Sequence, residues 1–179
     1  MAPTPSKDLP PWLKLAFRVP NSLYANGLGR LLGHRFLQLT HTGRRTGRPH
    51  HVVLEVVRYD RRSGEATVIC GFGHHADWLR NVRSGGPAWV DFGRGPIPAA
   101  YREVSVVEAE EVYAAYERRN RLVAPGVRWT LTALLGWRYD GSPAARRRMV
   151  EELPMLVLSP AGHPRRRLPG RRRSRPLRR

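Results

Sequence analysis

The sequence predicts a mainly β fold, an antiparallel barrel with flanking helices. Five stretches rich in β-branched and aromatic residues follow one another between residues 36 and 107. Short links containing glycine, proline or aspartate join most of them, which suits neighbouring antiparallel strands. The chain has 179 residues, of which 41% are hydrophobic, so it can bury one sizeable core. We expect one barrel domain over residues 36–160 with an appended segment at each end.

The first three strands are expected over residues 36–42, 51–59 and 66–70. Each of these stretches combines branched aliphatic, threonine or aromatic side chains in the way that strands favour. Residues 60–64 read Asp-Arg-Arg-Ser-Gly, which is the composition of a hairpin loop. The second and third strands are therefore expected to pair directly.

Two further strands are expected over residues 88–92 and 99–107. The sequence Gly-Arg-Gly-Pro at residues 93–96 lies between them and predicts the turn of a second hairpin. A short apolar run at residues 155–158 has a proline on each side. Because proline cannot donate a ladder hydrogen bond, this run predicts a sixth strand at an edge of the sheet.

Helices are expected over residues 77–83, 108–121, 129–135 and 144–153. Asp77 is expected to cap the first of them at its N-terminus. The second has glutamates in its first turn and arginines in its last, as the helix dipole favours. The last three helices form a helical insert near residues 108–153 that precedes the sixth strand.

The N-terminal segment, residues 1–35, has apolar residues at roughly helical spacing with Lys14, Arg18, Arg30 and Arg35 between them. Such a basic amphipathic segment either packs over the core or rests on an anionic membrane surface. Prolines and charges interrupt its apolar stretch, so we expect neither a signal peptide nor a spanning helix. The predicted location is cytoplasmic, with a peripheral position at the inner face of the cell membrane as the alternative.

Half of the net charge of +18 lies in the C-terminal tail. Residues 164–179 contain nine arginines and no acidic residue. A like-charged segment punctuated by proline and glycine buries little apolar surface, so residues 161–179 are expected to be disordered. The tail is expected to bind polyanions without sequence preference, because no aromatic residue interleaves the arginines to stack on bases.

A basic turn is expected between the first two strands. Its two glycines permit positive φ values, which would aim successive backbone N–H groups into one concavity. Guanidinium groups match phosphate or carboxylate oxygens, and threonine hydroxyls add donors. A plain hairpin turn needs the glycines but not three arginines. We therefore predict that the basic turn binds an anion through Thr42, Gly43, Arg44, Arg45, Thr46, Gly47 and Arg48.

A second constellation, the glycine loop (residues 71–81), lies between the third strand and the first predicted helix. It reads Gly-Phe-Gly-His-His-Ala-Asp-Trp-Leu-Arg-Asn. Glycines allow the backbone to approach a flat ligand closely, and the helix start presents N–H donors. The alternative is an ordinary connection in which Trp78 packs in the core and Asp77 only caps the helix.

Other chemistries have weaker support in the sequence. The single cysteine, Cys70, leaves no internal disulfide and no thiolate zinc site. Adjacent histidines at 50–51 and 74–75 point to opposite faces if they lie on strands, so we expect no metal site. No hydrolase elbow, Walker loop or zinc-protease helix motif occurs. Tyr113 and Tyr116 are acid–base candidates, although tyrosines three residues apart also form the packed face of a helix.

Three segments together resemble the deazaflavin-dependent nitroreductase family of high-GC actinobacteria. They are residues 39–49, which contain the basic turn, residues 76–82, which read Ala-Asp-Trp-Leu-Arg-Asn-Val, and residues 153–158. The similarity covers roughly residues 20–160, in the same order. The resemblance implies a split β-barrel, FMN-binding-like, that binds coenzyme F420, an 8-hydroxy-5-deazaflavin with a phosphate and an oligoglutamate arm. FMN is the alternative cofactor.

The resemblance also implies roles for individual residues. Arginines and threonines of the basic turn would hold the anionic arm, namely Thr42, Arg44, Arg45, Thr46 and Arg48 with Gly47. The deazaflavin ring would lie against Gly71, Phe72, Gly73, Asp77, Trp78 and Asn81. Tyr116 is the candidate proton donor. The chain departs from the best-known branch of the family, which has a lysine in the loop where this sequence reads Gly-Phe-Gly-His.

Three functions remain open at the level of sequence. The first is an oxidoreductase that transfers a hydride from reduced F420 to a small-molecule electron acceptor, namely a quinone, a nitro compound or an activated alkene. The second is a noncatalytic F420 carrier or sequestering protein that uses the same pocket. The third is a charge-driven nucleic-acid-binding protein. A homodimer is a further possibility for the assembly, for which the sequence holds no direct signal.

Overall fold

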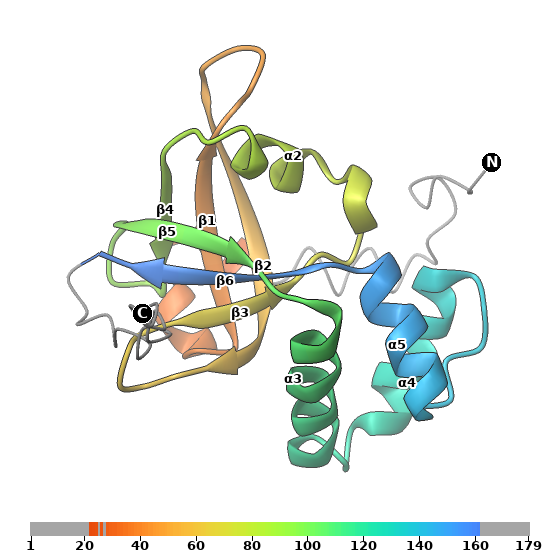
Figure 1. The fold of residues 1–179 in the computed structure, drawn as a ribbon. Coiled ribbons are helices and arrows are strands. Elements are labelled where there is room, and N and C mark those ends of the chain that lie inside the picture. The colour runs from red at the N-terminus through yellow and green to blue at the C-terminus, as the bar shows by residue number, and fades with distance from the viewer. Residues whose placement is uncertain (1–21, 25, 27, 162–179) are drawn as a thin grey trace, which may run out of the picture.

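A computed structural model describes residues 22–24, 26 and 28–161 of the chain (Figure 1). Most of the N-terminal amphipathic segment and nearly all of the arginine-rich tail lie outside the described residues, so the expectations for them stay predictions. The described part has a β-barrel on one side and three helices on the other. It thus contains the barrel and the helical insert that the sequence predicts.

Six antiparallel strands close the barrel in the order β1-β2-β3-β6-β5-β4. Strands β2 and β5 pair with neighbours in both of its sheets, so the barrel is split into two sheets that share these strands. This confirms the predicted mainly β, antiparallel split barrel. The strands are β1 (Phe36–Thr42), β2 (Pro49–Tyr59), β3 (Ala66–Ile69), β4 (Ala88–Asp91), β5 (Ile97–Glu103) and β6 (Met155–Pro160).

The sixth strand was predicted at an edge of the sheet, and this prediction is wrong. β6 lies between β3 and β5 and pairs with both along its length. Its apolar residues are buried on both faces, because one face lines the barrel and the other lies under the helices. The flanking prolines, Pro154 and Pro160, are placed where they do not interrupt the ladder between them.

The interior of the barrel is one apolar cluster. In β1 buried and partly buried residues alternate, so Leu37 and Leu39 point inward and are fully buried. Leu156 and Leu158 of β6 meet them from the opposite wall. Helix α2 (Asp77–Arg83) adds Leu79 to the cluster. Its N-cap residue is Ala76, which has no side-chain cap, so the expectation that Asp77 caps the helix is wrong.

A second apolar cluster lies between the barrel and the helices α3 (Val106–Arg119), α4 (Ala124–Leu135) and α5 (Pro143–Glu152). α3 begins at Val106, in a stretch predicted as strand. The Oγ of Ser105 accepts a hydrogen bond from the N–H of Glu108, which starts the helix there. Two short 3-10 helices, η1 (Gly29–Leu32) and η2 (Gly73–His75), complete the fold.

Candidate functional site

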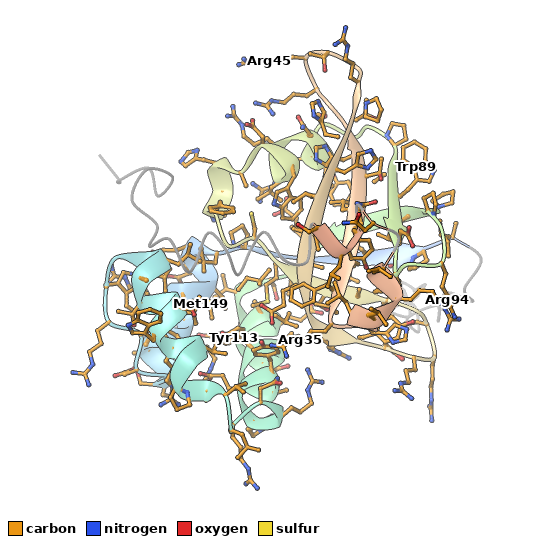
Figure 2. All side chains as sticks on the ribbon, turned by 180° about the vertical axis from the view of Figure 1, so that it is seen from behind. Arg35, Arg45, Trp89, Arg94, Tyr113 and Met149 are labelled. Atoms are coloured by element: carbon orange, nitrogen blue, oxygen red, sulfur yellow. The ribbon has the colours of Figure 1, made fainter. Side chains whose placement is uncertain are left out.

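A cavity of about 570 Å³ lies between the outer face of β2 and the helices. Val53, Glu55 and Val57 of β2 face it, alternating with core-facing Leu54 and Val56. The lining is mostly apolar and aromatic, with a few polar groups, as is usual for sites that hold small organic molecules. Residues from the glycine loop, α3 and α4 form the remaining walls. Figure 2 shows Arg35 and Tyr113 where the barrel meets the helices.

The cavity brings together four of the residues predicted for the site. Gly71, Phe72 and Trp78 line it from the glycine loop, and Tyr116 lines it from α3. Trp78 is also part of the barrel core, so the packing interpretation applies to it, and contact with a ligand stays a prediction. The remaining predicted residues do not line this cavity, namely Thr42, Arg44, Arg45, Thr46, Gly47, Arg48, Gly73, Asp77 and Asn81.

The basic turn stands at the tip of the β1–β2 hairpin, where Figure 2 labels Arg45. Gly47 has a φ of 64°, as expected. Gly43 has no positive φ. A Cβ there would lie 2.8 Å from the Nε2 atom of His50, so a larger residue would require the exposed side chain of His50 to shift.

Part of the expected concavity of free N–H groups in the basic turn is not available. The N–H of Gly43 donates to the carbonyl of Arg48, and the N–H of Gly47 donates to the carbonyl of Gly43. The N–H of Arg48 donates to Oγ1 of Thr46. The turn uses these three groups to hold its own shape, and anion binding by the turn stays a prediction.

Arg44 fastens the basic turn to α2. Its guanidinium donates to Oδ1 of Asn81 at 2.8 Å and to Oδ1 of Asp77 at 3.0 Å. Its backbone N–H also donates to Oδ1 of Asn81, at 3.1 Å. Asn81 is buried, and its Nδ2 lies 3.3 Å from Nδ1 of His41. Hydrogen bonds of Arg44 with Asn81 and Asp77 thus connect the basic turn to the glycine loop.

The other two arginines of the basic turn are exposed. Among the residues that the structure describes, no hydrogen bond or ion pair engages the side chain of Arg45 or Arg48. Thr42 has its hydroxyl against the carbonyl of Pro87, at 3.4 Å. The turn therefore offers two guanidinium groups to an anion, and Arg44 supports them.

The glycine loop packs tightly against the end of α5. Gly73 has a φ of 67°, and a Cβ there would lie 3.1 Å from the carbonyl oxygen of Glu152, so glycine is required. The thiol of Cys70 donates to the carbonyl of Gly73. Burial raises the pKa of this thiol to about 12, so it stays protonated and is no nucleophile.

Tyr116, Glu55 and Arg35 form a polar group in the cavity wall. The hydroxyl of Tyr116 donates to Oε1 of Glu55 at 2.7 Å, and a guanidinium nitrogen of Arg35 lies 3.8 Å from the same oxygen. Burial, and then the negative charge of Glu55, raise the pKa of Tyr116 well above its usual range. Its phenol is therefore neutral at physiological pH and able to hold a proton beside the cavity.

Sequence reasoning missed Glu55. The signal was present, because Glu55 is the one carboxylate within the otherwise apolar run of residues 52–57. Most of the surrounding strand is buried or partly buried and the side chain of Glu55 is only 35% exposed, so its carboxylate gains from a hydrogen-bond partner. That partner, Tyr116, is 61 residues away in the sequence.

In residues 22–161, as far as they are described, no group of three or more histidine, cysteine, aspartate or glutamate side chains is arranged to hold a metal ion. None of the helices in the same part of the chain combines the length and the apolar character needed to cross a membrane.

Comparisons with known proteins give a likeness of fold. No protein-family model and no curated protein matches the chain. Among solved structures it is similar to an F420-H2 dependent reductase, with 19% identity over 70% of this chain and 94% of that one and a TM-score of 0.43.

Two other solved structures show similarity of the same order. One is described as a domain-swapped dimer (17% identity, 82% of this chain and 98% of that one, TM-score 0.47). The other is a pyridoxamine 5'-phosphate oxidase-related, FMN-binding protein from Nostoc punctiforme (16% identity, 86% and 82%, TM-score 0.41). Similarity at this level assigns no function to the chain.

Proposed function

We propose that the protein is an oxidoreductase that uses reduced coenzyme F420 to reduce a small organic acceptor. The observation that carries the proposal is the cavity of about 570 Å³, which α2 lines through Trp78, while Arg44 attaches the basic turn to the same helix. Gly71, Phe72 and Trp78 line its wall nearest α2, where the sequence resemblance puts the deazaflavin ring. An apolar and aromatic lining suits a flat ring system.

The residues present fit the anionic arm of such a cofactor. Arg45 and Arg48 are exposed on the basic turn, and the carboxylate closest to that turn, Asp77, is paired with Arg44. Two guanidinium groups at a hairpin tip match phosphate or carboxylate oxygens. In this proposal they hold the arm, while Arg44 and Asn81 fix the position of the turn.

When bound, the reduced deazaflavin supplies a hydride. An acceptor such as a quinone then needs one proton to become the hydroquinone. Tyr116 is the proposed donor, because its neutral phenol lies in the cavity wall. Its O–H points to Oε1 of Glu55 in this structure, so donation requires the O–H to turn toward the acceptor, and solvent then returns a proton to the phenolate. The apolar walls would exclude water from the reacting groups.

Titration of the purified protein with F420 and with FMN tests the proposal. We expect F420 to bind more tightly, and binding to weaken about tenfold in Arg45→Gln, since each charge-assisted contact contributes on the order of 1.4 kcal/mol. Tighter binding of FMN, or no binding of F420, would contradict the proposal. Binding of F420 without oxidation of its reduced form by any quinone or nitroaromatic compound would favour the carrier function instead.

A further inference from the structure

A second hollow of about 400 Å³ adjoins the cavity at the far end of β2. Arg35, Val57 and Tyr116 line both spaces, so the two are neighbours at these three residues. We call the second space the basic hollow. Its other charged or titratable lining residues are His34, Tyr59, Arg61 and Arg119, and its lining contains no carboxylate.

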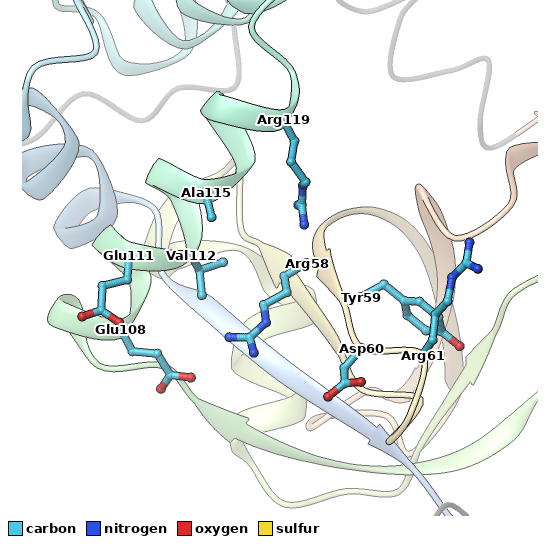
Figure 3. A pocket seen from close by; sticks show the side chains of 9 residues that line it. All are labelled: Arg58, Tyr59, Asp60, Arg61, Glu108, Glu111, Val112, Ala115 and Arg119. Carbon is cyan, nitrogen blue, oxygen red and sulfur yellow. The ribbon is translucent and has the colours of Figure 1, made fainter.

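The three arginines of the basic hollow come from separate elements. Arg35 precedes β1, Arg61 lies in the β2–β3 loop, and Arg119 ends α3. In Figure 3 the side chain of Arg119 extends from α3 toward the barrel, and Arg61 lies beside Tyr59 on the loop. Arg119 is held in place because its Nη2 donates to the carbonyl of Val57 at 2.6 Å.

The charge of the basic hollow is only partly offset. Glu55 lies at the junction with the cavity, 3.8 Å from Arg35, and also accepts the hydrogen bond of Tyr116. His34 stacks on Tyr59 with ring centroids 4.0 Å apart. Burial lowers the pKa of His34, and the positive charges of Arg61 and Arg94 lower it further. This wall therefore keeps a surplus of positive charge.

The groove on the other side of Arg61 and Arg119 differs from the basic hollow in the charges of its lining. It is the space of about 340 Å³ drawn in Figure 3, and its lining includes Asp60, Glu108 and Glu111 with Arg58. Hydrogen bonds, from the backbone of Arg62 to Asp60 and from the side chain of Arg102 to Glu108, lower the pKa of these carboxyl groups, and the charge of Arg58 lowers it further. Three carboxylates thus line that groove, whereas none lines the basic hollow.

We propose that the cavity and the basic hollow together bind a small molecule with a planar apolar body and an anionic group. The body would lie in the cavity, and the carboxylate, sulfonate or phosphate would lie against Arg35, Arg61 and Arg119. The strand from Val52 to Val57 that lines the cavity spans roughly 17 Å, at 3.3–3.4 Å per residue. Along the chain, the basic turn precedes the Val52 end of this strand, and the basic hollow lies at its Val57 end.

This inference rests on the proposed function, because that function identifies the ligand as the electron acceptor. The cofactor arm would leave the cavity toward the basic turn, and the anionic group of the acceptor would occupy the other end. The proposed acceptors are thus anionic aromatic compounds, and uncharged ones of the same shape are poorer substrates.

Binding is tested first, without cofactor, by fluorescence titration with 1-anilinonaphthalene-8-sulfonate and with its uncharged counterpart N-phenyl-1-naphthylamine. We expect the sulfonate to bind more tightly. In Arg61→Gln and in Arg35→Gln its Kd should rise about tenfold, as expected for loss of one charge-assisted contact, while the Kd of the uncharged probe stays within about twofold. Circular dichroism would establish that each variant is folded.

Arg62→Gln is the matched control, because Arg62 lies in the same loop, is exposed and lines neither the cavity nor the basic hollow. We expect it to leave both Kd values unchanged. Equal loss in Arg61→Gln and Arg62→Gln, equal effects on the two probes, or no effect at all would each overturn the basic hollow as an anion site.

Turnover is tested second, with reduced F420 and two acceptors, 1,4-naphthoquinone-2-sulfonate and 2-methyl-1,4-naphthoquinone. Arg61→Gln should raise KM about tenfold for the sulfonate only. Selective probe binding without any turnover would support the basic hollow as an anion site and contradict the proposed oxidoreductase function. Turnover of both quinones with no effect of Arg61→Gln would support the oxidoreductase function and contradict the basic hollow as an anion site.

Discussion

At the Pro49 end of β2 the arginines stand on one continuous turn, whereas at the Tyr59 end they come from three separate segments of the chain. The first group is visible as a sequence motif, and one of its members, Arg44, is used to attach the turn to α2. The second group has no motif, and its arginines face an open hollow. A conspicuous basic motif can therefore be partly structural, while the binding surface that we propose is assembled from scattered residues.

The contrast between a partly structural basic turn and an open basic hollow depends most on Asn81, which is the buried residue that links the basic turn to α2. Asn81→Ala would leave the N–H of Arg44 and the ring of His41 without this partner. We expect the free energy of unfolding to fall by about 2–4 kcal/mol, because buried polar groups lose their hydrogen bonds. Urea denaturation followed by tryptophan fluorescence measures this, and a loss below about 1 kcal/mol would show that the turn does not need the link.

Arg44 and Arg45 are neighbours with different contacts, so they make a matched pair. Arg44→Ala should lower the free energy of unfolding by about 1–2 kcal/mol, since it removes a hydrogen bond to a buried amide. Arg45→Ala should change it by less than about 0.5 kcal/mol, as is usual at exposed positions. Equal effects in thermal or urea unfolding would mean that Arg44 is no more structural than its neighbour.

The pH dependence of the free energy of unfolding tests the environment of Tyr116, which lines both the cavity and the basic hollow. Burial and the charge of Glu55 raise the pKa of Tyr116 above its ordinary value of 10.0, so the folded state keeps a proton that the unfolded state loses. The free energy of unfolding should therefore fall as the pH rises above about 10. Tyr116→Phe should make this fall shallower, by up to ~1.4 kcal/mol per pH unit, and cost about 1 kcal/mol at pH 7. Unfolding curves of equal slope in the two proteins would contradict this.

The smallest effect is expected at Asp77. Its side chain is 81% exposed, although it lies 3.0 Å from the guanidinium of Arg44. Exposed ion pairs contribute little, so Asp77→Asn should change the free energy of unfolding by less than about 0.5 kcal/mol. A loss as large as that of Arg44→Ala would assign the bracing of the turn to Asp77 instead of Asn81.

The strands could be predicted from sequence because their signals are local. Alternation along β1 and the turn residues of the two hairpins determine pairing between neighbours in the chain. The central place of β6 could not be predicted, since it depends on pairing with β3 and β5, both distant in the sequence. α3 begins earlier than predicted because Ser105 caps the helix before Val106, although Val106 and Val107 have a high strand propensity.

Less of the candidate site could be predicted than of the fold. The glycine loop gave Gly71, Phe72 and Trp78, which do line the cavity. The pair of Tyr116 and Glu55 joins residues from α3 and β2, and no local pattern connects them. Nor does a motif show that Asn81 is engaged by Arg44, because a sequence names donors and acceptors without saying which of them meet.

The closure of the barrel has a consequence for association with other chains. Each of the six described strands has a neighbour on both sides for at least part of its length. β3 and β6 are paired on both sides over most of their length, whereas the two halves of β2 are each paired on one side, with β1 and with β3 in turn. Addition of a strand from a second molecule, a common route to aggregation, is therefore blocked along β3 and β6. Assembly through that part of the barrel must form by side-chain contacts, or by opening the ring and exchanging a strand.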